Sequence, residues 1–249
     1  MRYIKSAFVC LFFASNVFAQ QIADTTFQPD VRDPAFQTGT GPVVFLDAAH
    51  NNYHTLDGRF LAFAKVLRSD GYIVRSSGAL FSAATLDDAD ILVISNALNE
   101  RNVEDWSLPT PSAFTADEIE AVRAWVEEGG SLWLIADHMP MPGAASELAA
   151  AFGFRFNNGF AVDTTSRDVT IFRRSDGSLR DHPITAGRHG GERVDSIRTF
   201  TGQAFQADGS ADALFVFRRP MTSFMPAVAW QFDENTQVIP VHGWFQGAV

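Results

Sequence analysis

Residues 42–55 read PVVFLDAAHNNYHT, a short apolar run that ends at an acid and is followed by two histidines. The run from Val43 to Leu46 shows no alternation of apolar and polar side chains, which is typical of a strand buried on both faces. Further strands are predicted at 72–75, 90–94 and 131–136. The stretch therefore predicts the first strand of a parallel sheet.

Amphipathic helices are predicted between these strands. Apolar residues recur at helical spacing over 60–67, and Gly71 ends that helix. Thr115 and Glu118 have the spacing of a capping box, which starts a second helix that Gly129-Gly130 ends. A third helix is expected over 144–152. Strands alternating with helices predict βαβ units and a three-layer α/β fold around a parallel sheet.

The second half of the chain is expected to be rich in strands and to hold no long helix after residue 153. Strand candidates there are 154–156, 169–172, 197–200, 214–217, 228–232 and 238–241.

The composition excludes several classes of partner. The 249 residues include 19 Lys and Arg against 29 Asp and Glu, for a formal charge of -10. This charge argues against a nucleic-acid binder and against an anionic membrane surface as partner. No apolar run reaches the roughly 18 residues that a permanent membrane span needs.

The N-terminus has the layout of a secretory signal peptide. Arg2 and Lys5 precede the apolar run of residues 7–14, and Val17-Phe18-Ala19 offers a small-residue cleavage site. We therefore expect residues 1–19 to be removed on export to the periplasm or the exterior, residues 20–41 to form a linker and residues 42–249 to form the domain. Removal would take Cys10, the only Cys of the chain, and would leave no thiol nucleophile.

The chemistry-bearing residues gather after the predicted strands. In open parallel sheets, ligands bind outside the carboxyl ends of the strands. Asp47, His50 and His54 follow the first strand, and Asp137 and His138 follow the fourth. We expect Asp47, His50, Asp137 and His138 to line one crevice, where a His and an Asp would act as general base and orienting partner.

Two other interpretations of the same residues stay open. His50, His54 and His138 could hold a divalent metal such as zinc, which accepts imidazole and carboxylate together. Alternatively, Asp47 and Asp137 only cap the following turns through side-chain to amide hydrogen bonds.

Residues that would contact a substrate are predicted in the loops of the same edge. They are Asn51, Asn96 and Arg101, together with Trp106 in the long segment 99–114. Trp106 would either stack on a sugar or an aromatic ligand, or anchor this segment to the core. The sequence holds no dinucleotide fingerprint, P-loop, HExxH motif or GxSxG elbow.

Four motifs resemble those of a known group of proteins. They are FLDAAHNNYHT (45–55), AVRAWVEEGG (121–130), SLWLIADHMP (131–140) and DHPITAGR (181–188). Over residues 42–249 the chain resembles an uncharacterised exported family of the class I glutamine amidotransferase-like superfamily, with ThuA-like proteins as distant relatives.

This resemblance implies a flavodoxin-like three-layer sandwich. It also implies departures, because the amidotransferases place a nucleophilic Cys where this chain has Asp137-His138, so glutamine hydrolysis by the thiol route is not expected. His138 matches a His of ThuA-like proteins, whose link to sugar use points to carbohydrate. Relatives continue past a segment like 243–248 into a strand and a helix, so we expect this sequence to be either a naturally short or a truncated form.

Two functions follow as hypotheses. The first is an exported hydrolase-like enzyme that acts on carbohydrate or a related small molecule. The second is a non-catalytic domain that binds a glycan or a protein partner through the same crevice.

Export is expected to leave Gln20 at the N-terminus, because the small residues Val17 and Ala19 precede it. Mass spectrometry of the protein recovered from the periplasm or medium should give the mass of residues 20–249, with or without cyclisation of Gln20. Exported material that still begins with Met1 would contradict this prediction.

Overall fold

The computed structural model describes residues 22–164 and 169–249. The predicted signal segment 1–19 therefore lies outside the described residues. The first half of the chain builds a parallel sheet of β1 (Val43–Asp47), β2 (Ile73–Ser77), β3 (Ile91–Ser95) and β4 (Ser131–Ile135), in the order β2-β1-β3-β4. This order matches the first four strands of the flavodoxin-like arrangement, so the predicted fold class is confirmed.

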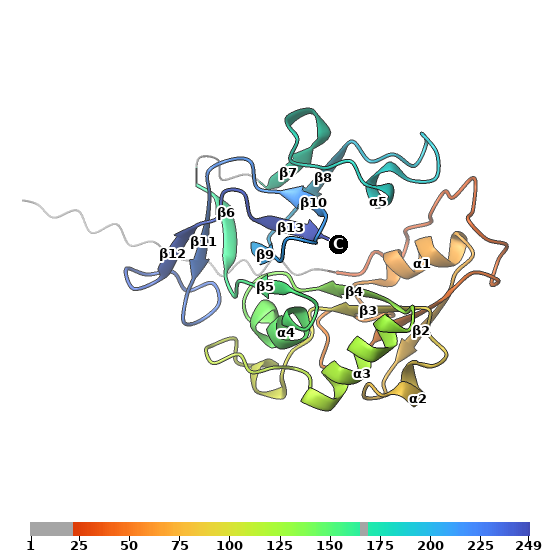
Figure 1. Cartoon of the computed structure of the whole chain (residues 1–249), viewed down its shortest axis with the longest axis horizontal. Helices are drawn as coiled ribbons and strands as arrows, with labels where there is room; N and C mark the ends of the chain where they lie inside the picture. The colour runs from red at the N-terminus through yellow and green to blue at the C-terminus, as the bar shows by residue number, and fades with distance from the viewer. Residues whose placement is uncertain (1–21, 165–168) are drawn as a thin grey trace, which may run out of the picture.

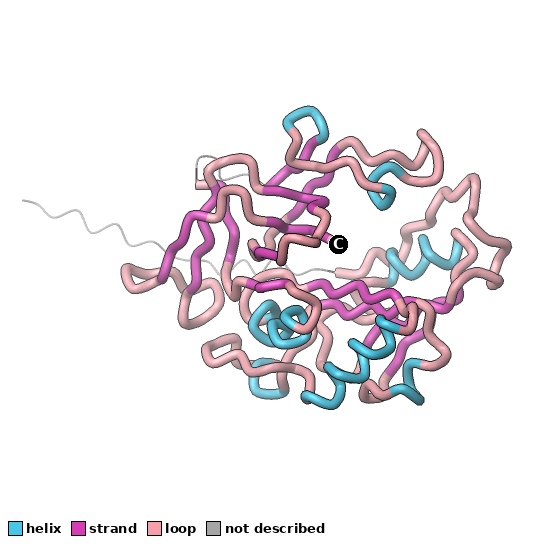
Figure 2. Tube along the Cα trace, in the orientation of Figure 1, coloured by secondary structure: helices cyan, strands magenta, loops and turns pink. Residues whose placement is uncertain are grey.

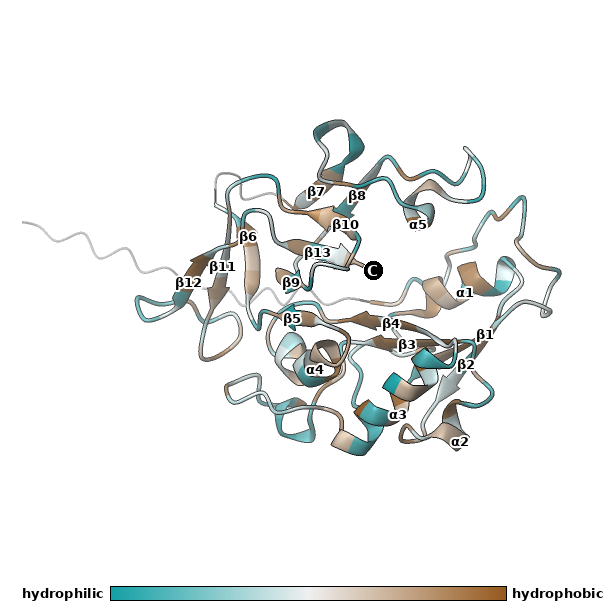
Figure 3. Ribbon diagram, viewed as in Figure 1, coloured by the Kyte–Doolittle hydropathy of each residue, from teal (hydrophilic) through white to brown (hydrophobic). Residues whose placement is uncertain are grey.

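Helices cover both faces of this sheet. One side carries α1 (Leu61–Ser69), and the other carries α2 (Ala83–Leu86), α3 (Ala116–Glu127) and α4 (Met141–Ala150) (Figure 1). Side chains alternate across β3, with Leu92 and Ile94 packed in the core under α3, and Val93 in the core that includes Ala64 of α1. Figure 3 shows the apolar strands β3 and β4 beside the polar outer side of α3. Burial on both faces explains the continuous apolar runs of β1 and β3, whereas Trp133 of β4 is exposed.

The capping box that starts α3 forms as predicted. The Thr115 hydroxyl accepts a hydrogen bond from the Glu118 amide at 3.3 Å, and the Glu118 carboxylate accepts one from the Thr115 amide at 3.0 Å. The helix ends before Gly129, whose φ of 112° is unfavourable for residues with a Cβ.

The second half is built from strands, as expected, and these gather at the end of the parallel sheet where β4 leads into α4 (Figure 2). Two sheets have the orders β10-β13-β9-β5 and β12-β11-β6, and β7 pairs with β8. Their bounds are β5 (Phe154–Phe156), β6 (Phe160–Asp163), β7 (Thr170–Arg173), β8 (Ser196–Thr199), β9 (Phe205–Ala207), β10 (Ala213–Val216), β11 (Met221–Met225), β12 (Gln237–Pro240) and β13 (Phe245–Ala248). The described helices here are α5 (Pro183–Ala186) and the 3-10 turn η2 (Arg174–Asp176); another 3-10 turn, η1 (Glu100–Asn102), follows β3.

The predicted strand at 228–232 is wrong. The segment makes one isolated bridge, between Val228 and Ser107, and Trp230 then adopts a left-handed conformation with a φ of 67°. Its apolar residues therefore serve to pack against the segment 99–114 instead of forming a ladder. Ala229 is buried in a small core with Met139 and Phe160.

The segment ahead of β1 lies along α1. Residues 22–42 form no helix or strand. The Lys65 amino group of α1 donates hydrogen bonds to the carbonyls of Thr25 and Phe27, both at 2.9 Å. The Ala35 amide donates to the Asp70 carboxylate. Among the described residues, no helix has the length and apolar character required to cross a membrane.

Candidate functional site

The ends of β1, β3 and β4 meet at one edge, and Asn96 ties them together. Its amide donates to the Ile135 carbonyl at 2.8 Å, its carbonyl accepts from the Tyr53 amide at 3.0 Å, and its side-chain oxygen accepts from the Asp137 amide at 2.8 Å. Asn96 has a φ of 58° and is 1% exposed. This predicted substrate-binding residue therefore holds the strand ends in place.

Asp47 and His50 form a buried ion pair that extends to a third residue. His50 Nδ1 lies 2.9 Å from Asp47 Oδ2, and its Nε2 lies 2.8 Å from Glu118 Oε1. Asp47 is 0% exposed and His50 is 4% exposed. The rings of Phe81 and Phe114 pack on the imidazole at 4.6 and 4.7 Å. The pair lies beneath the edge, closed off from a ligand in this conformation.

The charges of this cluster stabilise one another. Burial by itself lowers the pKa of His50, but the hydrogen bonds and charges of Asp47 and Glu118 raise it above its usual value. Burial acts to raise the pKa of Glu118, and hydrogen bonds from Thr115, His50 and the Phe81 amide lower it overall. Since both nitrogens face carboxylates, the geometry favours a doubly protonated His50.

A chain of hydrogen bonds leads from this cluster toward His54. The Asn52 amide group donates to Asp47 at 2.5 Å and accepts from the Ser95 backbone amide at 3.1 Å. The Ser95 hydroxyl lies 2.9 Å from His54 Nδ1. Ser95 is 0% exposed, so its hydroxyl positions His54 and is not placed to act as a nucleophile.

His54 is held as a neutral ring. It stacks on Phe60 with a centroid separation of 4.6 Å and is 8% exposed. Burial lowers the pKa of His54 to about 4, the nearby Asp137 carboxylate opposes this shift, and the Arg59 charge adds to it. At neutral pH the ring is therefore an uncharged neighbour of Asp137.

Asp137 and His138 face different surroundings. The half-buried Asp137 accepts a hydrogen bond from the Thr201 hydroxyl at 2.8 Å. His138 Nδ1 lies 2.8 Å from the Met139 carbonyl, so Nδ1 carries the proton and Nε2 keeps its lone pair in the neutral ring. The imidazole stacks on Phe160 at 4.5 Å and meets Trp230 edge-on at 4.7 Å.

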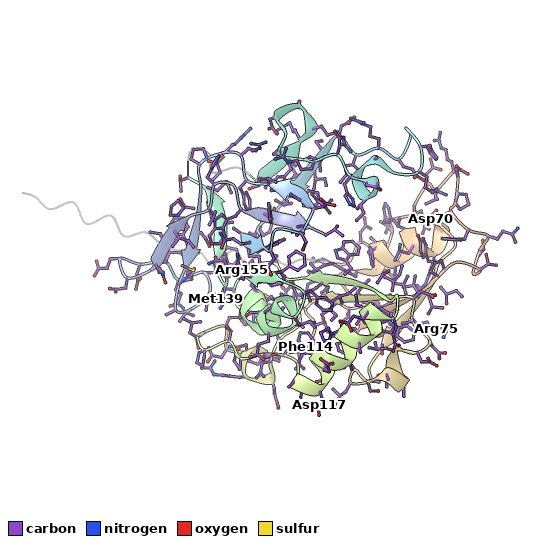
Figure 4. The ribbon with its side chains drawn as sticks, viewed as in Figure 1. Asp70, Arg75, Phe114, Asp117, Met139 and Arg155 are labelled. Carbon is purple, nitrogen blue, oxygen red and sulfur yellow. The ribbon has the colours of Figure 1, made fainter. Side chains whose placement is uncertain are left out.

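The segment 99–114 covers this end of the sheet. The Trp106 ring lies 5.8 Å from Tyr53 and 6.0 Å from His138, between centroids. Trp106 also packs against the small core of Met139, Phe160 and Ala229, which anchors the segment. Figure 4 labels Met139 beside α4. It also labels Phe114, the last residue of the segment, beside α3.

The other predicted contact residues make local bonds. The Arg101 guanidinium donates to the carbonyls of Ser107 and Leu108, both at 3.2 Å, and so shapes its own loop. The exposed Asn51 has a φ of 47° and donates to the Leu98 carbonyl at 3.3 Å.

The four predicted catalytic residues thus fall into separate groups. Asp47 and His50 contact each other, Asp137 interacts with His54, Asn96 and Thr201, and His138 sits among aromatic rings. Asp47 does cap the following turn, since its Oδ1 accepts from the Ala49 amide at 3.0 Å, but it also contacts His50 and Asn52. The sequence analysis missed Glu118 as a His50 partner, as well as Tyr53, Thr201 and Trp230.

The zinc hypothesis requires several donor side chains that converge on one point. Within residues 22–164 and 169–249, no group of three or more His, Cys, Asp or Glu side chains is arranged to hold a metal ion. Both nitrogens of His50 already face carboxylates. A zinc site through His50, His54 and His138 therefore stays a prediction without a preformed donor set.

Replacing Glu118 by Ala should lower the free energy of unfolding by about 3 kcal/mol, because it leaves His50 buried with one partner removed. Glu120→Ala on the exposed side of the same helix is the matched control and should lower the stability much less, because its ion pair with Arg123 is screened by solvent. Urea unfolding of both variants measures the difference. Equal losses in the two variants would show that the His50 bridge contributes no stability.

His50 and His54 should give opposite pH dependences of stability. The raised pKa of His50 gives a contribution present below about pH 6.5 and lost as pH rises through the folded value. The lowered pKa of His54 gives one present above about pH 6.5 and lost as pH falls toward about 4.

Urea unfolding between pH 5 and pH 8 tests this. His54→Asn should flatten the loss of stability on the acid side, and His50→Asn should flatten the loss on the basic side. NMR titration of wild-type imidazole signals should place one ring near 4. If the signals of His50 and His54, assigned by comparison with the two variants, both titrate near 6.5, the result contradicts this prediction.

The chain was compared with known proteins. No family model matches it, and no curated protein matches it by sequence. Among solved structures it is similar to the mmIFT52 N-terminal domain, with a TM-score of 0.54 and 15% identity over 80% of this chain and 85% of that chain. It is also similar to a putative ThuA-like protein from Bacteroides uniformis, with a TM-score of 0.41 and 12% identity over 88% of this chain and 86% of that chain. The mmIFT52 likeness shows the fold alone.

Proposed function

We propose that this chain is an exported domain that binds a carbohydrate, or a similar small molecule rich in hydroxyl groups, at the carboxyl edge of its parallel sheet. One observation supports this most directly. The Trp106 ring contacts both Tyr53 and His138, so aromatic side chains from the β1 and β4 ends form one surface. The N-terminal motif of residues 1–19 supports export.

The surface has the chemistry that sugars require. A sugar ring presents an apolar C–H face and a rim of hydroxyls, so its sites combine aromatic faces with a few fixed polar groups. Tyr53 and Trp106 are half-buried, which leaves part of each ring accessible. Asp137 lies at the same edge, and its carboxylate keeps acceptor capacity beyond the Thr201 bond.

The surrounding bonds pre-organise these groups. Arg59 lies 3.9 Å from the centroid of the Tyr53 ring, and its guanidinium donates to the Tyr53 carbonyl. The Ala229 amide donates to the Trp106 carbonyl at 2.9 Å and fixes the backbone that presents the ring. A rigid site loses less entropy when it binds a small ligand.

Hydrolysis is the second candidate, and the tautomer of His138 is the observation that favours it. Its Nε2 keeps a lone pair while Nδ1–H is held by the Met139 carbonyl, as a general base requires. Water would be the nucleophile, since Ser95 is fully buried and Cys10 would leave with the signal peptide. The separation of Asp47 and His50 from His138 places the binding function first.

The motifs shared with the class I glutamine amidotransferase-like superfamily and its ThuA-like members support the same proposal through their link to sugar use. We take the chain to be a distant member of that superfamily. The net charge of -10 supports a ligand other than a nucleic acid.

Calorimetric titration with a panel of neutral monosaccharides tests the proposal. At least one should bind, and Trp106→Ala should weaken it about tenfold or more, equivalent to roughly 1.4 kcal/mol. Trp133→Ala, which removes a Trp that is 51% exposed on β4, is the matched control and should bind normally. No binding by any sugar, or equal losses in both variants, would refute it. Turnover of aryl glycosides that His138→Gln abolishes while binding persists would establish the hydrolase.

A further inference from the structure

We propose that the ligand is an extended, uncharged oligosaccharide, which runs from the rings of Tyr53, Trp106 and His138 across an aromatic surface on the sheet β12-β11-β6. This inference rests on the proposed function and names the size and charge of its ligand. We call this surface the platform and define it by five residues. They are Val162, Phe224, Trp230, Phe232 and Val238.

The register of the sheet creates the platform. Phe160, Phe224 and Val238 form one cross-strand row, and Val162, Thr222 and Pro240 form the next row on the same face. The alternate row, Ala161, Ser223 and Ile239, turns inward, with Ser223 0% exposed. The sheet therefore points an apolar face away from its core.

Four of the five platform residues are exposed in the described part of the chain, whereas Phe224 is half-buried and the neighbouring Phe160 is buried. Val162 is 41% exposed, Trp230 46%, Phe232 47% and Val238 51%. Single exposed apolar residues are ordinary, but a contiguous group of them marks an interaction site. Figure 1 places β11 and β12 at the outer end of the molecule.

Ring contacts connect the platform to Tyr53, Trp106 and His138 without a break. Trp230 lies 4.7 Å from His138 and 4.6 Å from Phe160, between centroids. Phe232 continues the series, at 5.3 Å from Phe160 and 5.9 Å from Phe224. A ligand bound over Tyr53 and Trp106 would meet these rings next.

The backbone of Trp230 is an independent observation. Its φ of 67° is an outlier for a bulky residue, and such conformations persist mainly where the surroundings enforce them, often at binding sites. Hydrogen bonds on either side, from Ala229 to Trp106 and from Gln231 to Val228, hold it. The fold thus keeps an unfavourable conformation that presents a half-exposed ring.

The charge distribution selects the occupant. All five platform residues are uncharged, and the exposed acids Asp233 and Glu234 follow Phe232 directly. With a net charge of -10, the protein would repel an anionic lipid surface, an acidic polysaccharide or a nucleic acid. Flat rings without charge fit the C–H faces of successive neutral sugar units.

The experiment measures how affinity depends on chain length. Calorimetric titration uses gluco-, xylo- and manno-oligosaccharides of one to six units. In the wild type, affinity should rise at least tenfold from one unit to six for the preferred series. Phe232→Ala should reduce that rise to less than threefold while leaving the affinity for the single unit unchanged. Phe27→Ala, which removes a Phe that is 37% exposed in the segment along α1, is the control and should keep the full rise.

The outcomes separate the two proposals. Binding of a single unit with no gain from longer chains overturns the platform and leaves the proposed function standing. Failure of every sugar of every length overturns both. Light scattering adds one more result that would overturn the platform, namely a wild-type dimer that Phe232→Ala converts to a monomer. A circular dichroism spectrum of Phe232→Ala that matches the wild type would show that the variant is folded.

Discussion

The Asp47 carboxylate is an anion fully removed from solvent, and its need for hydrogen-bond partners constrains the chain that follows β1. A buried charge is tolerated only where hydrogen bonds replace its hydration. Three partners do so here: the Ala49 amide, the His50 ring and the Asn52 side chain. His50 also contacts Glu118 at the start of α3. The Asn52 side-chain oxygen accepts a hydrogen bond from the Ser95 amide of β3. One buried anion thus joins the strand, the neighbouring strand and the helix into one unit.

This constraint divides the polar residues of the sheet edge by depth. Those nearest β1 satisfy each other beneath the surface, and their side chains have little capacity left for a ligand. After β4, Asp137 is half-buried, and the buried His138 contacts the more accessible rings of Trp106 and Trp230. The carboxyl edge therefore combines a buried supporting network with the surface that we propose binds the ligand. Sequence position alone could not separate the layers, because both contain Asp and His directly after buried strands.

The sequence predicted the features that depend on local pattern. The apolar runs gave the four parallel strands, and the spacing of Thr115 and Glu118 gave the start of α3. It could not show that Glu118 also binds His50, since 68 residues separate them and only the fold brings them together. Strands β6, β9, β11 and β13 escaped notice, and in the last three polar residues or glycine interrupt the apolar pattern. The segment 228–232 was mistaken for a strand because its apolar residues pack individually, Ala229 in the small core and Trp230 and Phe232 on the rings of neighbouring strands.

The two halves of the chain meet at this edge, and the binding surface exists only where they do. Thr201 bonds Asp137, Gln203 bonds the Ala136 carbonyl, and Phe160 stacks on His138. In addition, the Ala229 amide in the second half donates a hydrogen bond to the Trp106 carbonyl in the first half. None of these contacts lies within one secondary-structure element, so the geometry of the surface depends on how the β-rich half docks on the parallel sheet. A ligand that touches Tyr53 on one side and Trp230 on the other would bridge this junction. Its binding free energy would then also oppose separation of the halves, which links recognition to the stability of the fold.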